Sequence, residues 1–425
     1  YCQDYLLPAL AYAADALRDA HAPELSEGLV RLMAAEQAYS GAGSFYGRRL
    51  AALAEANPYY YTRLESDRAC VLGMALAWAP LVKSPPPPAE SFERSVAGGW
   101  IEPEHGAAMH RSPTRLASFA WRARGLGQGL CLPPDDGHLA EWQGNLCGAV
   151  RFPCDSLPVR AERALRSARV AAFPGGFLAC GQIVEGAKVH LPEGWIGENQ
   201  LLHFLCFAAL PDDRTVAAIE LMRTGPGRVY LTEVQGMHFV LPNDLYNGFE
   251  RRVTGEQGEM RLRTPAPAGV LDLISPWVNL DGRIGLAGLY GAESLRVARA
   301  DERRAGFYPS LYVEEFAWGG WRGTRAVEGG ATVLDVGWAA ASGVDAPATR
   351  DWARAQPPAR SHSALGPVRQ MEILGFDGRR YVLAANFGEA RADIELPPAT
   401  DCLTGAAAGG MTTLEGGQGG LFVRA

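Results

Sequence analysis

Residues 105–145 read HGAAMHRSPTRLASFAWRARGLGQGLCLPPDDGHLAEWQGN. The stretch begins just past a change of pattern, because helical spacing of apolar residues precedes it and short apolar runs with turn residues follow it. It gathers histidines, arginines, a carboxylate and tryptophans at that boundary. Ligand sites favour the junctions between domains, so the stretch predicts a site where a helical part meets a β part.

The region before this boundary has the pattern of a helical domain. Apolar residues recur at helical spacing from Leu6 onward, and the connections are short, which predicts antiparallel helix hairpins. Helices are expected over about residues 3–20, 24–39, 46–56 and 64–79. Asn57-Pro58 is expected to end the third helix. We therefore predict a helical domain over residues 1–83 and a stiff proline-rich linker over 84–91.

The region after the linker has the pattern of a β protein. Short apolar runs such as Leu116–Trp121 and Leu201–Leu210 alternate with Gly, Pro, Asn and Asp, as in antiparallel sheets that pack face to face. We predict a large β-sandwich over residues 92–365 and a small terminal β module over 366–425.

Composition excludes several classes of protein. A net charge of −7 argues against a nucleic-acid partner, since phosphate-binding proteins carry a basic excess. No apolar run approaches the length of a membrane span, so no membrane partner is expected. The eight cysteines form no CxxC motif, and their spacing leaves open whether any of them form disulfides. The oligomeric state is not predicted by any of these features.

The order of helices, linker, long β region and small β module resembles one group of polysaccharide lyases. In this group, the heparinase II/III-like and chondroitin/hyaluronan lyases, an α/α toroid precedes antiparallel β-sandwich domains. The resemblance rests on Met109-His110-Arg111-Ser112-Pro113, on the aromatic run ending in Trp121-Arg122, and on Glu141-Trp142-Gln143-Gly144-Asn145. These stretches are similar to a His-Arg strand and a Glu/Asn strand early in the family's β domain.

The resemblance implies a multidomain α+β fold. It comprises N-terminal α/α-toroid helices, a large antiparallel β-sandwich and a small C-terminal β-sandwich. Residues 1–83 supply fewer hairpins than a full toroid, so the toroid is expected to be partial or reduced. The implied activity is cleavage of a uronic-acid-containing, glycosaminoglycan-type polysaccharide by β-elimination. A secreted or periplasmic location would suit that substrate.

Elimination needs a base, a proton donor and a group that neutralises the uronate carboxylate. The catalytic candidates are Tyr46, which follows a Gly-rich loop, His110, and His238, which precedes a dense polar loop. Each also has a structural interpretation. Tyr46 could pack between helices, and a histidine on a strand is commonly a hydrogen-bonded structural residue. His110 and Arg111 are adjacent, so only one of them can face a cleft.

The candidates for substrate binding are aromatic or polar residues near the same loops and strands. Tyrosines can stack on a sugar ring or plug an interface, arginines suit carboxylates, and Asn in a loop can also serve turn geometry. The set is Tyr39, Tyr60, Arg63, His105, Arg111, Arg122, Glu141, Trp142, Asn145 and Asn243.

Elimination of this kind requires no cofactor, although part of the family is known for a zinc site in the β domain. His203 is the candidate ligand for a divalent metal. It sits inside an apolar run and lacks a partner at a short ligand spacing, so packing in the core is the alternative.

Two other functions stay open. Paired carboxylates such as Glu314-Glu315 keep a glycoside hydrolase as an alternative, although neighbours on a strand cannot face one bond together. The second alternative is a noncatalytic carbohydrate-binding protein that uses the same aromatic and arginine residues.

Overall fold

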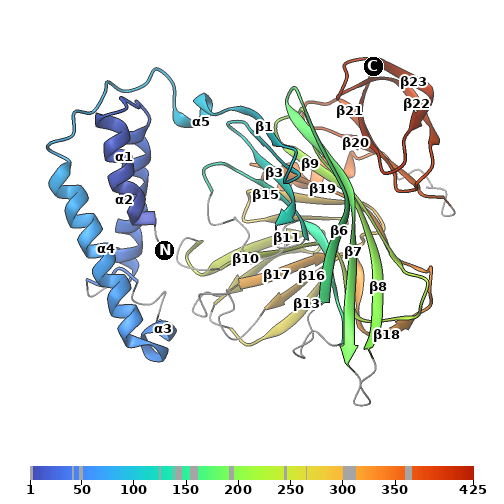
Figure 1. Cartoon of the computed structure of the whole chain (residues 1–425), viewed down its shortest axis with the longest axis horizontal. Helices are drawn as coiled ribbons and strands as arrows, with labels where there is room; N and C mark the ends of the chain where they lie inside the picture. Colours follow the sequence, from blue (N-terminus) through green and yellow to red (C-terminus); the bar gives the residue numbers. More distant parts are fainter. Residues whose placement is uncertain are drawn as a thin grey trace.

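The chain is a helical arm beside a layered β body in this computed structural model (Figure 1). The structure describes residues 3–40, 43–46, 51–123, 126–136, 139, 146–153, 161–190, 196–243, 247–264, 266–299, 313–358 and 366–425. No helix among these residues is long and apolar enough to cross a bilayer.

In the part of the arm that the structure describes, there are a short 3-10 helix and four α-helices. These are η1 (Gln3–Tyr5), α1 (Leu6–Asp15), α2 (Ala22–Ser40), α3 (Ala51–Ala56) and α4 (Pro58–Trp78). Helix α3 ends at Ala56, and Asn57 caps α4: its side chain accepts from the backbone N–H of Tyr60 at 3.1 Å, and Pro58 occupies the first helical turn. The predicted end of the third helix before Asn57-Pro58 is therefore confirmed, whereas the fourth helix begins at Pro58 and not near residue 64.

The expected α/α toroid is wrong. A toroid is a closed ring in which each helix hairpin buries both flanks against its neighbours. In the described part of residues 1–83, α1 contacts α2 and α4, and these helices bury few residues, such as Leu7 and Leu64. Tyr12, Leu17 and Leu81 remain exposed. The apolar spacing predicts helices but not a closed ring, because it does not show how many neighbouring helices each helix packs against.

The described residues of the β body form four antiparallel sheets. Sheet A has the order β1 (Gly98–Glu102), β2 (Ala107–Arg111), β3 (Leu116–Ala123), β4 (Leu126–Leu132). Sheet B has the order β13 (Gly269–Ile274), β16 (Ser294–Arg299), β17 (Val313–Trp318), β10 (Val229–Pro242), β18 (Gly320–Val327), and β5 (Cys147–Arg151) also pairs with β10.

Sheets C and D complete the body. Sheet C has the order β12 (Gly258–Arg263), β11 (Glu250–Gly255), β14 (Trp277–Leu280), β15 (Ile284–Tyr290), β19 (Thr332–Ser342), β9 (Thr215–Thr224), β8 (Ile196–Ala209), β7 (Gly176–His190), β6 (Ala161–Phe173). Sheet D has the order β20 (Val368–Leu374), β21 (Arg380–Asn386), β24 (Gly419–Arg424), β22 (Ala392–Asp401), β23 (Ala407–Leu414). Two short helices, α5 (Phe92–Ser95) and α6 (Ala346–Arg354), accompany the sheets.

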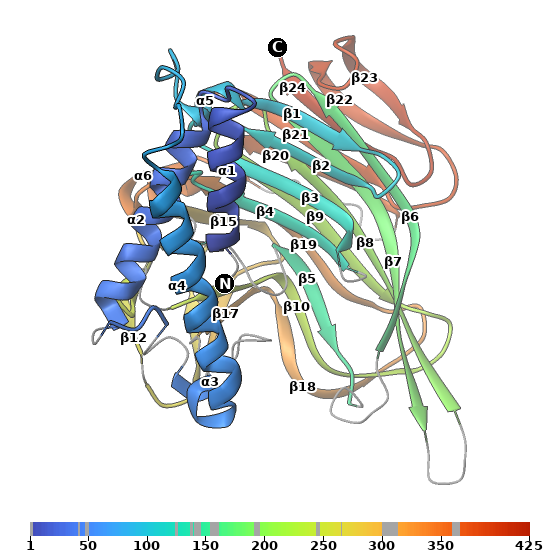
Figure 2. The same ribbon diagram turned by 60° about the vertical axis from the view of Figure 1, so that its left-hand side comes forward.

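Sheet C is the central layer, with apolar residues on both faces. One face packs against sheets A and B through a core that includes Phe119, Phe207 and Trp338. The other face packs against sheet D through residues such as Cys206 and Tyr381. Successive residues of β8 point to opposite faces, so burial of both faces explains its nearly continuous apolar run. Figure 2 shows β1 to β4 of sheet A lying across the long strands of sheet C.

The terminal module is a single five-stranded sheet and not the expected small sandwich. Its strand β21 buries both faces: Tyr381 and Leu383 contact sheet C, while Val382 and Ala384 contact a separate small core. That second core lies on the far face of β21, with Ile394 and Leu396 of β22. The alternating pattern was the same as in a sandwich, so sequence could not distinguish the two arrangements.

Candidate functional site

A cluster of charged side chains lies on the face of sheet B that points away from sheet C. Strand pairing brings it together: β10 pairs with β17 on one side and with β5 on the other, so Glu233 lies opposite Arg151. Glu314 and Glu315 are neighbours on β17 and point to opposite faces. Glu314 faces the interior and Glu315 joins this cluster. We call it the His238 cluster, which consists of Arg151, Glu233, Gln235, His238, Arg296 and Glu315.

Glu315 is the centre of the His238 cluster. Its Oε1 accepts from Arg151 Nη2 at 2.7 Å, from Gln235 Nε2 at 2.9 Å and from His238 Nε2 at 3.0 Å. Burial raises the pKa of Glu315, but the hydrogen bond and charge of His238, the charge of Arg151 and the hydrogen bond from Gln235 outweigh that effect. The net pKa is well below its usual range, so Glu315 is a carboxylate at neutral pH.

The carboxylate of Glu315 fixes the tautomer of His238. Nε2 must carry a proton to donate to Glu315, which in the neutral ring leaves the lone pair on Nδ1. Nδ1 is covered and has no hydrogen-bond partner in the part of the chain that the structure describes. A histidine held by a carboxylate on one nitrogen, with a lone pair on the other, has the arrangement of a general base.

Glu233 is the second carboxylate of the cluster. It accepts from Gln235 Nε2 at 3.0 Å and forms ion pairs with Arg296 at 3.2 Å and Arg151 at 3.4 Å. Because Gln235 Nε2 bonds to both carboxylates, an oxygen of Glu233 and Oε1 of Glu315 lie within about 6 Å of each other. The site therefore combines a histidine, two carboxylates and two arginines, and Arg151 is half-exposed.

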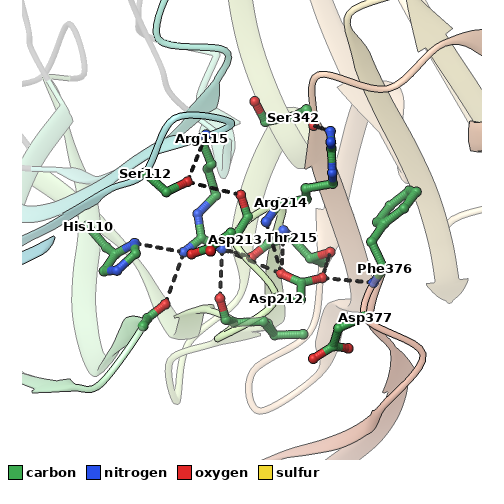
Figure 3. Close-up of polar contacts among 12 residues, drawn as sticks. His110, Ser112, Arg115, Asp212, Asp213, Arg214, Thr215, Ser342, Phe376 and Asp377 are labelled. Carbon is green, nitrogen blue, oxygen red and sulfur yellow. Dashed lines mark hydrogen bonds and ion pairs between the residues drawn. The ribbon is translucent and has the colours of Figure 1, made fainter. Parts of the chain in front are cut away.

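His110 lies elsewhere, where sheets A, C and D meet (Figure 3). Arg115 is fully buried there and donates to the carbonyls of Leu210 and Thr215 at 2.8 and 2.7 Å. Its Nη2 lies 3.1 Å from His110 Nδ1, which must accept because arginine only donates. Burial and the charge of Arg115 lower the pKa of His110. The geometry thus explains His110 as a neutral structural acceptor.

The same junction contains a carboxylate that ties sheet D to sheet C. Asp212, in the turn between β8 and β9, accepts from the N–H of Thr215 at 2.8 Å and from the N–H of Phe376 at 3.0 Å (Figure 3). Arg115 Nη1 lies 3.7 Å from the same carboxylate. The sequence pattern did not draw attention to Arg115, since its partners are backbone carbonyls far along the chain.

Tyr46 lies in the helical arm and is buried. Its ring packs with Leu64, partly buried Tyr60 contributes to the same cluster, and the Arg68 guanidinium lies 4.2 Å from the ring centroid. Its backbone N–H donates to Glu65 at 2.8 Å. Burial raises the pKa of Tyr46 well above its usual value, so the hydroxyl keeps its proton. The structure therefore gives Tyr46 a packing role between helices.

His203 lies in the core between sheets C and B, between two buried carboxylates. Its Nδ1 lies 3.1 Å from Glu185 and its Nε2 lies 3.1 Å from Glu220. Burial lowers the pKa of His203, but the two carboxylates raise it to about 9. Both nitrogens then donate, so neither has a lone pair for a metal. The residues do not fit a metal site, and the described part of the chain contains no group of three or more such ligands placed for one.

Most of the remaining candidates for binding lie apart from the His238 cluster. Asn243 is fully buried and donates to Glu314 at 2.6 Å and to the carbonyl of Leu262 at 2.9 Å. Arg111 forms a bidentate pair with Glu93. Residues that lie mainly at the surface are Arg63 on α4, His105 in the turn after β1, and Arg122 on β3. Glu141, Trp142, Asn145 and the side chain of Tyr39 lie outside the described residues.

Comparison with known proteins adds distant structural neighbours. No known protein family and no curated protein matches the sequence. Similar structures include an alpha-galactosidase from Lactobacillus brevis (10% identity, 59% of this chain and 41% of that chain, TM-score 0.34). Another is a chondroitin AC lyase from Streptomyces coelicolor (13% identity, 94% of this chain and 59% of that chain, TM-score 0.34). A third is a putative aldose 1-epimerase from Klebsiella pneumoniae (8% identity, 58% of this chain and 82% of that chain, TM-score 0.32).

These neighbours thus include a polysaccharide lyase and glycoside hydrolases. The chain spans about two fifths of the length of the galactosidase structures. TM-scores this low do not establish a common fold.

Proposed function

We propose that the chain is a polysaccharide lyase that acts on an anionic, uronic-acid-containing polysaccharide by β-elimination, with His238 as the proton acceptor. One observation carries the proposal: Glu315 holds His238 through Nε2, which leaves the Nδ1 lone pair without a partner among the described residues. This arrangement lies beside Arg151, a half-exposed cation suited to a uronate carboxylate.

The chemistry follows from these groups. Nδ1 of His238 takes the proton from the carbon next to the uronate carboxylate, while Arg151 stabilises the charge that develops on that carboxylate. The bond from the adjacent carbon to the glycosidic oxygen then breaks, and a carbon–carbon double bond forms. The departing oxygen takes a proton from the imidazolium or from water. Because Nδ1 is covered without substrate, its neighbours must shift on binding.

The test is incubation with hyaluronan, chondroitin, alginate and polygalacturonate, followed by ultraviolet absorbance of the unsaturated product. We expect absorbance to rise with one of these polymers, and His238→Ala to lower the rate about a hundredfold or more. His21→Ala is the matched control, since His21 lies in the helical arm and pairs with Glu24. An unchanged rate in His238→Ala would remove His238 from the chemistry. Tyr46→Phe and His110→Ala test the two remaining catalytic predictions in the same assay.

A glycoside hydrolase is the second candidate, and the proximity of Glu233 and Glu315 favours it. Retaining hydrolysis uses two carboxyl groups about 5–5.5 Å apart, one of them protonated. The lowered pKa of Glu315 leaves it suited only to the nucleophile role, so Glu233 would have to be the acid. New reducing ends without the ultraviolet signal would identify hydrolysis. Binding without either product would identify a noncatalytic carbohydrate-binding protein.

A further inference from the structure

Arg151 is the last residue of β5, a five-residue strand whose position needs explanation. Strand β5 pairs with β10, from Glu233 opposite Arg151 to His238 opposite Cys147. The hydroxyl of Thr232 adds a bond to the carbonyl of Arg151 at 3.0 Å. A strand this short gains limited stability from its ladder, so the placement of Arg151 depends on what holds β5 from the other side.

The core holds β5 through one carboxylate. The side chain of Glu220, on β9 of sheet C, is fully buried and accepts from the backbone N–H of Gly148 at 2.6 Å. A Cβ atom at position 148 would lie 2.6 Å from Glu220 Oε2 and 2.8 Å from the carbonyl of Gln235. Residue 148 must therefore be glycine for sheet C to reach the backbone of β5 in this way.

Glu220 is itself fixed on every side. Its Oε1 accepts from Trp338 Nε1 at 2.8 Å, and its Oε2 also lies 3.1 Å from His203 Nε2. The opposite nitrogen of His203 is held by Glu185, which accepts from Arg163 at 3.3 Å. The acceptor of the Gly148 N–H is thus a charged group in a fixed position, and such charge-assisted bonds are about twice as strong as neutral ones.

We infer that Glu220 is a positioning residue: from the sandwich core it fixes β5, and thereby holds Arg151 against the His238–Glu315 pair. The contacts run without a gap from Glu220 to the N–H of Gly148, along β5 to Arg151, and from Arg151 to Glu315 at 2.7 Å. This inference rests on the proposed function for the role of Arg151, but the attachment of β5 can be measured independently.

Glu220→Gln is the informative substitution because both oxygens of Glu220 accept. Whichever way the new amide turns, its NH2 group faces a donor, from Trp338 on one side or from Gly148 and His203 on the other. Glu185→Gln is the matched control: it removes the same charge from the other side of His203 but leaves the acceptor of Gly148 in place. Gly148→Ala disturbs the same contact from the β5 side.

Hydrogen exchange read by mass spectrometry tests the attachment directly. Peptides that cover residues 147–151 should exchange at least about tenfold faster in Glu220→Gln and Gly148→Ala than in Glu185→Gln or the wild type. Equal exchange in Glu220→Gln and Glu185→Gln would overturn the inference. If Glu220→Gln does not fold, Gly148→Ala decides the question in the same way. The exchange experiment needs no substrate, so its result holds even if the wild type cleaves none of the polymers. A lack of cleavage would contradict the proposed function but not the attachment of β5.

A double-mutant cycle then tests the route through Arg151. With the polymer that the wild type cleaves, Glu220→Gln and Arg151→Ala should each lower kcat/KM about tenfold or more, the scale of a lost charged hydrogen bond. The double variant should be no worse than Arg151→Ala, because Glu220 acts only through that arginine. If the double variant instead loses kcat/KM by the product of the two single losses, Glu220 acts on the fold in general. That result would overturn its role as a positioning residue.

Discussion

His203 and His238 lie on strands of facing sheets, and both bond to buried or partly buried glutamates, yet their surroundings differ in one respect. His203 has a carboxylate on each ring nitrogen and is sealed in the core. His238 has a carboxylate on Nε2 and no partner on Nδ1 among the described residues. Two acceptors require a proton on both ring nitrogens, whereas one acceptor requires a proton on Nε2 alone and leaves Nδ1 able to hold a lone pair.

The difference teaches that the number of carboxylates on an imidazole separates a structural ion from a candidate base. His203 is the charge that allows Glu185 and Glu220 to stay buried. His238 is not required to keep Glu315 hydrogen-bonded, because Arg151 and Gln235 also donate to that carboxylate. Substitutions at the two histidines should therefore affect stability very differently.

The largest effect is expected for His203→Leu. The substitution leaves Glu220 in the core without its cation and Glu185 with Arg163 alone, and breaking a buried ion pair from one side costs about 3–5 kcal/mol. Urea unfolding of the wild type and the variant measures the difference in the free energy of unfolding. A loss below about 1 kcal/mol would show that the two carboxylates do not depend on the imidazolium.

An intermediate effect is expected from alkaline pH. The pKa of His203 is about 9 in the folded chain against 6.5 for the free side chain, so its folded pKa is raised. The resulting stability is fully present below about pH 6.5 and is lost as pH rises through about 9. The shift corresponds to about 3 kcal/mol by linkage.

Two measurements check the alkaline effect. Urea unfolding between pH 6 and pH 10 should show the decline in stability. NMR of histidine-labelled protein should show one ring, identified by its absence in His203→Leu, that titrates near pH 9. A midpoint below pH 7 for that ring would contradict the charged state inferred from the two carboxylate contacts.

The sequence predicted individual strands better than it predicted the assembly. The run Leu116–Trp121 lies within strand β3, and the run Leu201–Leu210 lies in strand β8 except for its last residue, because an apolar run between turn residues is a local property. The predictions of a toroid and of a terminal sandwich were wrong, because each depends on which helices or strands pack against one another. Neither a helical period nor a strand period contains that information.

The candidate site shows the same limit at the level of side chains. His238 was selected for its polar loop, but its partner Glu315 lies 77 positions away and is brought near by the pairing of β10 with β17. Arg151 was not among the candidates predicted from the sequence, since its place in the cluster depends on the pairing of β5 with β10. A hydrogen bond between distant strands leaves no mark on the local pattern.

The smallest effect on stability is expected for His238→Leu, which sharpens the comparison from the other side. The variant removes one of three donors to Glu315 Oε1, and the remaining bonds from Arg151 and Gln235 keep that carboxylate satisfied. The cost should therefore be that of one ordinary hydrogen bond, about 1 kcal/mol, measured by the same urea unfolding. A loss as large as that of His203→Leu would mean that His238 is also a structural ion, because a base with a free nitrogen should be dispensable for folding.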